Sequence, residues 1–294
     1  MTESSLLPSV LSVEWLAAHH QEVVIIDCRF ALGDVILGRK QYEAAHIPGA
    51  FYLDLNQDLS SNLSPEGRPL QSHGGRHPLP ETGRLVKRFS ELGIVRNQTN
   101  VVIYDDSRLG FAARLWWLLR YYGHEKVAVL DGGWRAWQEA GLPTSQEVPQ
   151  PVTSSQFEPD IRNHWVVDRA VVEARLASGA VVSGESVLVD SREPERYRGE
   201  VEPIDPVAGR IIGAVNYPWQ EVTHNNGLVI SEQRQRWADL LNNEPEEIIV
   251  YCGSGVTACV NLLSLHLAGV PAAKVRLYAG SWSDWCSFTD ETKS

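Results

Sequence analysis

Residues 248–258 read Ile-Ile-Val-Tyr-Cys-Gly-Ser-Gly-Val-Thr-Ala, a short apolar run that ends in a cysteine and passes into a loop of small residues. The run is typical of a buried strand, and a helical pattern follows the loop. Two glycines let the backbone curl around the sulfur, and the first N–H groups of a helix have no partner within it. They can point at a thiolate or a bound anion, so we expect Cys252 to be a reactive nucleophile. The alternative is a buried structural cysteine, since free cysteines are commonly buried and inert.

The same strand pattern occurs earlier in the chain. Residues 101–105, Val-Val-Ile-Tyr-Asp, parallel residues 248–252. Three further blocks pair in the same order: 24–29 with 187–192, 46–50 with 210–214, and 130–137 with 277–285. Paired blocks in one order indicate two homologous domains of a single fold.

Each half alternates short runs rich in Val, Ile and Leu with helical patterns such as residues 112–120. This alternation predicts the α/β class, with two small domains that each hold a mostly parallel sheet with helices on both faces. Between residues 141 and 163 the chain is polar, carries four prolines and has little periodicity, which is typical of a linker. We therefore expect domains at 1–142 and 164–294, joined by a linker at 143–163.

The two halves differ at the cysteine. The first half has Asp105 at the position of Cys252, so we expect the nucleophile in the second domain and a catalytically inactive scaffold in the first, with independent chemistry of the first domain as the alternative. The carboxyl ends of parallel strands, where Cys252 falls, are the usual ligand sites of such sheets.

The first half also has about 16 extra residues between the matched positions, and this surplus includes residues 60–80. Within that segment, residues 73–78 read His-Gly-Gly-Arg-His-Pro, which is polar and basic in an otherwise acidic chain. We hypothesise that Arg76 supplies positive charge to the site of the second domain.

Composition narrows the range of partners. The chain has 294 residues, 43% of them apolar, and a formal net charge of -11, which argues against nucleic acid or an anionic membrane as a partner. No run approaches the roughly 20 apolar residues of a membrane span, and residues 1–5 lack the basic start of a secretory signal. The four cysteines form no CxxC pair and no metal-ligand spacing, which predicts thiols without zinc or disulfides. We therefore expect a cytoplasmic protein.

On these motifs the chain resembles tandem-domain sulfurtransferases of the rhodanese type, over nearly its whole length. Residues 42–50, Tyr-Glu-Ala-Ala-His-Ile-Pro-Gly-Ala, look like the amino-terminal signature of that family, and residues 277–285 look like its carboxyl-terminal one. The loop of residues 252–258 is similar to that of the 3-mercaptopyruvate sulfurtransferase branch, whereas thiosulfate-preferring rhodaneses usually place cationic side chains directly after the cysteine. The loop therefore favours 3-mercaptopyruvate as the donor.

The resemblance implies a two-step reaction. Cys252 takes the outer sulfur from a donor, holds it as a persulfide, and passes it to cyanide or to a thiol such as a thioredoxin-like protein or a small thiol. Backbone N–H groups from Gly253 to Ala258, among them those of Gly255, Val256 and Thr257, would stabilise both the thiolate and the persulfide, so no metal or organic cofactor is needed. The Thr257 side chain would pack in the loop or donate a hydrogen bond to the sulfur.

The resemblance also implies roles for side chains outside the loop backbone. Arg196 would bind the anionic end of the donor, the alternative being a surface arginine among glutamates. The second arginine of the branch is missing from residues 200–206, so Arg198 or Arg210 would have to substitute. Ser254 would hydrogen-bond the donor carbonyl or relay a proton, or would cap the following helix. His46 would face the active site, or would anchor its own turn through a backbone hydrogen bond.

Other classes of protein fit less well or remain as alternatives. A phosphatase related to this fold needs an arginine six or seven positions after the cysteine, where this chain has Ala258 and Cys259. A thiosulfate:cyanide sulfurtransferase and a persulfide carrier without turnover stay open beside the 3-mercaptopyruvate enzyme. Turnover of a small donor by the isolated protein separates the carrier from the two enzymes.

Overall fold

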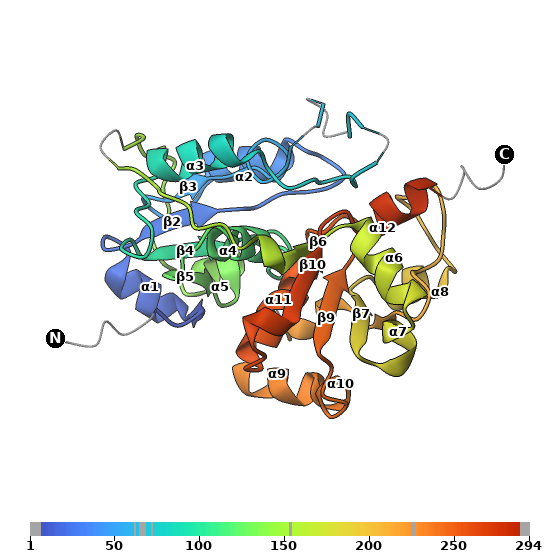
Figure 1. Ribbon diagram of the computed structural model, residues 1–294. Coiled ribbons are helices and arrows are strands. Elements are labelled where there is room, and N and C mark those ends of the chain that lie inside the picture. The colour runs from blue at the N-terminus through green and yellow to red at the C-terminus, as the bar shows by residue number, and fades with distance from the viewer. Residues whose placement is uncertain are drawn as a thin grey trace. The chain divides into compact units, whose positions relative to one another are not determined.

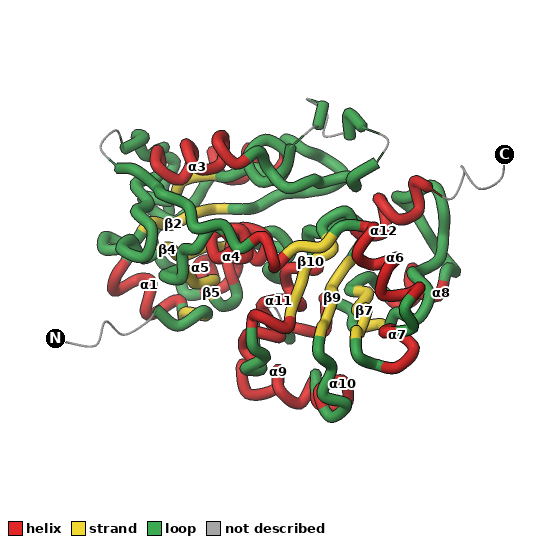
Figure 2. The backbone as a smooth tube through the Cα atoms, in the orientation of Figure 1, coloured by secondary structure: helices red, strands yellow, loops and turns green. Residues whose placement is uncertain are grey.

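The computed structural model describes residues 7–61, 63–64, 69–71, 73–152, 155–224 and 227–288, and Figure 2 shows where helices, strands and loops fall among them. These residues pack as two compact units. The first takes its residues from 1–61, 80–162 and 225–228, and the second from 62–79, 163–224 and 229–294. Residues 1–5, which lack the pattern of a secretory signal, lie outside the described residues. So do residues 62, 65–68 and 72 of the extra segment at 60–80, which is called the basic segment below.

The first unit is built on a five-stranded sheet in the order β1-β5-β4-β2-β3, and every neighbouring pair is parallel. Its strands are β1 (Val10–Leu11), β2 (Val24–Asp27), β3 (Phe51–Tyr52), β4 (Val101–Tyr104) and β5 (Val127–Leu130). Its helices are α1 (Val13–His19), α2 (Leu37–Ala44), α3 (Thr82–Glu91), α4 (Ala112–Tyr121) and α5 (Gly133–Glu139).

The second unit repeats this arrangement with the strand order β6-β10-β9-β7-β8, again with parallel pairs throughout (Figure 1). Its strands are β6 (Val166–Val167), β7 (Ser186–Asp190), β8 (Val215–Asn216), β9 (Glu247–Tyr251) and β10 (Val275–Tyr278). Its helices are α6 (Arg169–Ala177), α7 (Ala180–Ser183), α8 (Pro194–Arg198), α9 (Ile230–Arg236), α10 (Ala238–Leu241), α11 (Ala258–Leu267) and α12 (Ser281–Trp285). The predicted α/β class with two mostly parallel sheets is confirmed.

Burial on both faces explains the continuous apolar strands. Every residue of β9 is buried. Ile249 and Tyr251 pack in a core with Val172 of α6 and Trp282 of α12. The helix α11 also contacts β9 (Figure 1). Because successive side chains of a strand point to opposite faces, a strand covered on both sides needs an apolar residue at nearly every position.

The segment expected as a linker packs along the first unit. Ser145 pairs with His46 in an isolated bridge, and the backbone N–H of Val152 donates to the Glu91 carbonyl at 2.8 Å. Phe157 is only 1% exposed and lies edge-on to Phe89, with ring centroids 5.1 Å apart. The segment was predicted as a linker, and one buried aromatic residue and these backbone bonds attach part of it to the first unit. Among the described residues, no helix is both long and apolar enough to cross a bilayer.

A buried histidine of the first unit makes its stability depend on pH. Nδ1 of His124 lies 3.1 Å from the backbone N–H of Asn97, and Nε2 lies 3.1 Å from the Lys126 carbonyl. The fully buried ring is therefore the neutral tautomer that accepts at Nδ1, and burial lowers its pKa to about 4. Since histidine in an unfolded chain titrates near about 6.5, the unfolded state takes up the proton first.

We therefore predict that His124 stabilises the fold fully above about pH 6.5, and that about 3 kcal/mol is lost as the pH falls from there to about 4. Urea unfolding at pH 7 and pH 4.5 measures this loss. His124→Asn keeps an acceptor for the Asn97 N–H and should show a smaller loss than the parent or the half-exposed control His20→Asn. Equal losses in the parent and His124→Asn would contradict the assignment.

Candidate active site

Cys252 follows β9, the central strand of the second sheet, and its side chain is 1% exposed. The backbone N–H of Gly255 donates to the sulfur at 3.1 Å. Gly255 has φ +76°, and a Cβ there would overlap the carbonyl oxygen of Ala279, so only glycine fits this turn. The loop folds back over the cysteine and presents a backbone donor to its sulfur.

The start of α12 holds the backbone of the cysteine. The Cys252 N–H donates to Oγ of Ser281 at 3.1 Å, and the Cys252 carbonyl accepts from the Trp282 N–H at 3.0 Å. The Gly253 carbonyl accepts from the Ser283 N–H at 2.9 Å. These bonds come from the segment that resembles the carboxyl-terminal signature of the family, so that motif fixes the position of the Cys252 backbone.

Two arginines lie against the residue that follows the cysteine. A Cβ built on Gly253 would lie 2.9 Å from Nη2 of Arg76 and 3.4 Å from Nη2 of Arg196. Arg196 comes from α8, whereas Arg76 comes from the basic segment, which packs with the second unit. Glycine at position 253 leaves room for both guanidinium groups beside the cysteine loop.

Carboxylates hold these arginines in a chain of ion pairs. Asp205 pairs with Arg76 and with Arg196, the latter at 3.3 Å. Glu202 pairs with Arg196 at 2.7 Å and with Arg192 at 3.2 Å. The chain ends where Arg192 pairs with Asp190 at 2.6 Å and donates to the Gly209 carbonyl.

The chain is largely buried. The side chains of Glu202 and Asp205 are 3% and 2% exposed. Burial raises the pKa of Glu202, but hydrogen bonds from Arg196 and from the backbone N–H groups of Asp205 and Ile204 outweigh it and hold that pKa below its usual value. Glu202 is therefore a carboxylate at neutral pH and a fixed partner for both arginines.

The basic segment is tied to α12 and to the residues that directly follow it. Nδ1 of His73 lies 2.8 Å from Oγ of Ser287, and its ring stacks on Phe288. The Gly74 N–H donates to Asp284 at 2.7 Å, and the Arg76 N–H donates to Oγ of Ser283 at 3.0 Å. Hydrogen bonds on both sides of Gly75 thus set the position of Arg76.

His77 is a site residue that the sequence did not single out. Its Nδ1 lies 2.8 Å from Oγ of Ser254, and the side chains are 5% and 6% exposed. Thr257, not Ser254, stands at the N-cap of α11 and makes no side-chain cap bond. Ser254 therefore forms a buried pair with His77 instead of capping the helix. The basic run around position 76 was the available signal, but it did not distinguish His77 from His73.

The other predicted residues, and Cys259 next to the loop, lie as follows. Val256 is 4% exposed in the loop, and Cys259 is fully buried with its thiol 3.5 Å from the Gly255 carbonyl. Arg198 pairs with Glu195 and Glu200, and Arg210 stacks on the Tyr197 ring and donates to its carbonyl.

His46 is fully buried in the first unit. Its Nδ1 lies 2.7 Å from the Tyr42 carbonyl and its Nε2 lies 3.0 Å from the Glu147 carbonyl. Its ring also stacks on Tyr42, with centroids 4.0 Å apart. These backbone contacts favour the second role given for His46 above, in which its ring anchors the local turn.

The equivalent loop of the first unit is filled by its own carboxylate. Asp105 is 1% exposed and accepts four backbone hydrogen bonds of 2.8–3.0 Å. The donors are the N–H groups of Ser107, Leu109, Phe111 and Ala112. Burial raises the pKa of Asp105, and these backbone bonds oppose that shift. In this loop an aspartate stands at the position that Cys252 holds in the second unit.

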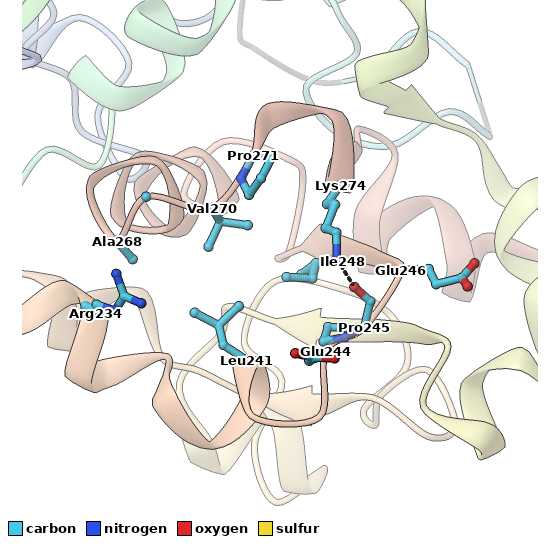
Figure 3. Close-up of a pocket in the computed structure, with 11 residues that line it drawn as sticks. Arg234, Leu241, Glu244, Pro245, Glu246, Ile248, Ala268, Val270, Pro271 and Lys274 are labelled. Atoms are coloured by element: carbon cyan, nitrogen blue, oxygen red, sulfur yellow. Dashed lines mark hydrogen bonds between the residues drawn. The ribbon is translucent and has the colours of Figure 1, made fainter.

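A cavity of about 570 Å³ in the second unit lies away from the cysteine. It is lined around Ile248, near the amino end of β9, whereas Cys252 follows the carboxyl end (Figure 3). Leu241 and Val270 point toward its centre, and Lys274 donates to the Pro245 carbonyl at 3.0 Å (Figure 3). Ligands of parallel sheets bind at the carboxyl edge, so this cavity is not the catalytic site.

Comparison with known proteins identifies the family. The sequence matches the family described as rhodanese-like domain twice, over residues 12–140 and 169–288. A probable 3-mercaptopyruvate sulfurtransferase of Pseudomonas aeruginosa is 41% identical over 283 residues, which are 94% of each chain. The thiosulfate sulfurtransferase of Cricetulus griseus is 30% identical and covers 97% of this chain and 94% of its own. The crystal structure of the Escherichia coli 3-mercaptopyruvate enzyme superposes with a TM-score of 0.74, 32% identity, and coverage of 93% of this chain and 98% of that one. The chain therefore belongs to the rhodanese-like family and carries one family domain in each half.

Proposed function

We propose that this protein is a sulfurtransferase that moves the sulfur of 3-mercaptopyruvate to a thiol or to cyanide through a persulfide on Cys252. The observation that carries the proposal is the meeting of Arg76 and Arg196 at Gly253, directly after the nucleophile. Two guanidinium groups beside a sulfur nucleophile suit a small anionic donor, whose carboxylate they bind while its sulfur meets the thiolate. The named relatives support transfer of sulfur, with either 3-mercaptopyruvate or thiosulfate in their names.

In the first half-reaction the Cys252 thiolate attacks the sulfur of the donor. An S–S bond forms, the C–S bond breaks, and its electron pair passes to the methylene carbon and the adjacent ketone as an enolate. The proton of the donor thiol balances the step, since it ends on the former methylene carbon, which becomes the methyl group of pyruvate. The Gly255 N–H, 3.1 Å from the sulfur, stabilises the anionic thiolate and persulfide.

The pair of Ser254 and His77 can serve the leaving enolate. When Nδ1 of His77 carries the proton it donates to Oγ of Ser254, which frees the serine hydroxyl proton to meet the ketone oxygen of the donor. The same pair can pass a proton as pyruvate forms. In the second half-reaction an acceptor thiolate or cyanide attacks the outer sulfur and releases the Cys252 thiolate.

The first unit is a catalytically inactive scaffold in this proposal, because Asp105 occupies the loop that a nucleophile would need. A cytoplasmic location is supported by the four cysteines, which are present as thiols. Thiosulfate is the second candidate donor, since the two arginines beside Gly253 would also bind sulfonate oxygens.

We predict that Arg196→Ala lowers kcat/KM for 3-mercaptopyruvate by about 10- to 100-fold, mainly through KM, because a charge-assisted pair with the donor is lost. Steady-state assays with 3-mercaptopyruvate and thiosulfate in parallel measure this. Arg198→Ala, on the same helix but paired with exposed glutamates, is the control and should match the parent. Unchanged kinetics in Arg196→Ala would remove Arg196 from the donor site.

We also predict that Ser254→Ala lowers kcat for 3-mercaptopyruvate by about 100-fold while changing thiosulfate turnover little, since sulfite leaves without an enolate to protonate. His77→Asn should follow the same donor pattern. His73→Asn alters a neighbouring histidine of the same segment and serves as control. Equal losses with both donors would assign Ser254 a purely structural role.

A further inference from the structure

We propose that Asp205 sets the charge of the donor site and thereby selects a monoanionic donor over a dianionic one. The inference rests on the proposed function and extends it to the class of donor. It starts from the position of Asp205, which is 129 residues from Arg76 in sequence and pairs with both donor-facing arginines. The single carboxylate of Asp205 thus forms an ion pair with the guanidinium group of each arginine.

The charges of this ion-pair chain cancel. Arg76, Arg192 and Arg196 alternate with Asp190, Glu202 and Asp205, and each neighbouring pair is in contact. At the rim, the half-exposed Glu193 lies 3.8 Å from Arg196. A donor that enters this site meets directed hydrogen-bond donors without a net positive field. This arrangement favours one carboxylate over a group with two charges, because a neutral cluster does not offset the cost of desolvating an anion, and that cost is larger for a dianion.

Burial makes the contribution of Asp205 large. Its side chain is 2% exposed and the side chains of Arg76 and Arg196 are 21% and 13% exposed, so solvent screens these charges little. Removing one negative charge stabilises any bound anion in proportion to the charge of that anion. Thiosulfate, with two charges, gains twice the interaction free energy that the 3-mercaptopyruvate carboxylate gains.

The residues after α8 account for the arginine that the 3-mercaptopyruvate sulfurtransferase branch has there and this chain lacks. Residues 200–206 carry no arginine but contain both Glu202 and Asp205. The second guanidinium comes from the basic segment instead, and Asp205 is the residue that holds it. Asp205 is a positioning residue in this account, since it acts on the donor through Arg76 and Arg196.

The test is the ratio of kcat/KM for thiosulfate to kcat/KM for 3-mercaptopyruvate in the parent, in Asp205→Asn and in Glu200→Gln. Glu200 is an exposed carboxylate paired with Arg198, so its replacement removes the same charge outside the chain of ion pairs. We expect the ratio to rise about tenfold in Asp205→Asn and to stay unchanged in Glu200→Gln. Added salt should reduce the gain. A ratio that does not move, with both donors slowed equally, overturns the proposal, because loss of positioning alone affects both donors.

A binding measurement keeps the charge inference separate from turnover. Calorimetric titration of the parent with propionate and with sulfate compares a monoanion and a dianion at the same site, and needs neither turnover nor a folded variant. We expect propionate to bind more tightly, and a preference for sulfate overturns the proposal. If the parent turns over neither donor but prefers propionate, the proposed function fails while the charge selection stands.

Discussion

Replacing Cys252 with serine is expected to abolish sulfur transfer from both donors, with a loss on the order of 10⁴-fold or more. The reason is chemical: the step needs an ionised, polarisable sulfur that can form a stable S–S bond, and a serine hydroxyl is neither ionised near neutral pH nor able to hold the transferred sulfur in that form. The hydroxyl is close in size to the thiol and can still accept from the Gly255 N–H, so the loop should keep its shape.

Cys259→Ser is the matched control for this loss. Cys259 lies in the first turn of α11, is fully buried, and donates its thiol proton to the Gly255 carbonyl, a bond that a serine hydroxyl can also make. It should retain most of the activity. If both variants lost activity to a similar extent at equal melting temperatures, the loss could not be assigned to a nucleophilic role that is specific to Cys252.

Asp105→Ala should cost about 4 kcal/mol in the free energy of unfolding of the first unit. Its carboxylate is the acceptor for four buried backbone N–H groups, and each buried donor left without a partner costs about 1–3 kcal/mol, part of which water entering the gap would recover. The loop also holds Arg108 at φ +56° and Leu109 at φ +68°, a left-handed conformation that residues other than glycine rarely adopt. Without Asp105, little would oppose the release of that strain.

The measurement is urea unfolding monitored by tryptophan fluorescence, and it compares the unfolding midpoint of Asp105→Ala with that of Asp106→Ala. Asp106 is the exposed neighbour in the same loop, so its replacement controls for the loss of a charge at this place. We expect a clear shift for Asp105→Ala and almost none for Asp106→Ala. Similar midpoints for the two variants would show that the four hydrogen bonds contribute little.

Much of this arrangement can be predicted from local sequence. Continuous apolar runs such as residues 248–251 identify buried parallel strands, and the paired blocks show that one fold occurs twice. The glycines after Cys252 indicate a tight loop, and Gly255 does adopt a positive φ. These signals are local because strand burial and turn geometry depend on neighbouring residues.

The rest of the site depends on contacts between distant parts of the chain. His77 meets Ser254 across 177 positions, and Arg76 meets Asp205 across 129. The charge and length of the basic segment made Arg76 a candidate, but no local pattern relates Asp205 to it. The sequence around Asp105 also does not predict the loop whose N–H groups surround this carboxylate. Two residues of that loop, Arg108 and Leu109, have positive φ, and neither is a type expected in a left-handed turn.

The most direct test of the central claim is to trap the intermediate. The purified protein is incubated with 3-mercaptopyruvate without an acceptor, alkylated, and studied by intact and peptide mass spectrometry. The account predicts one additional sulfur atom, on the peptide that carries Cys252, which disappears when cyanide or a thiol is added. Release of pyruvate without sulfur on Cys252, or sulfur on Cys28, Cys259 or Cys286 instead, would contradict it.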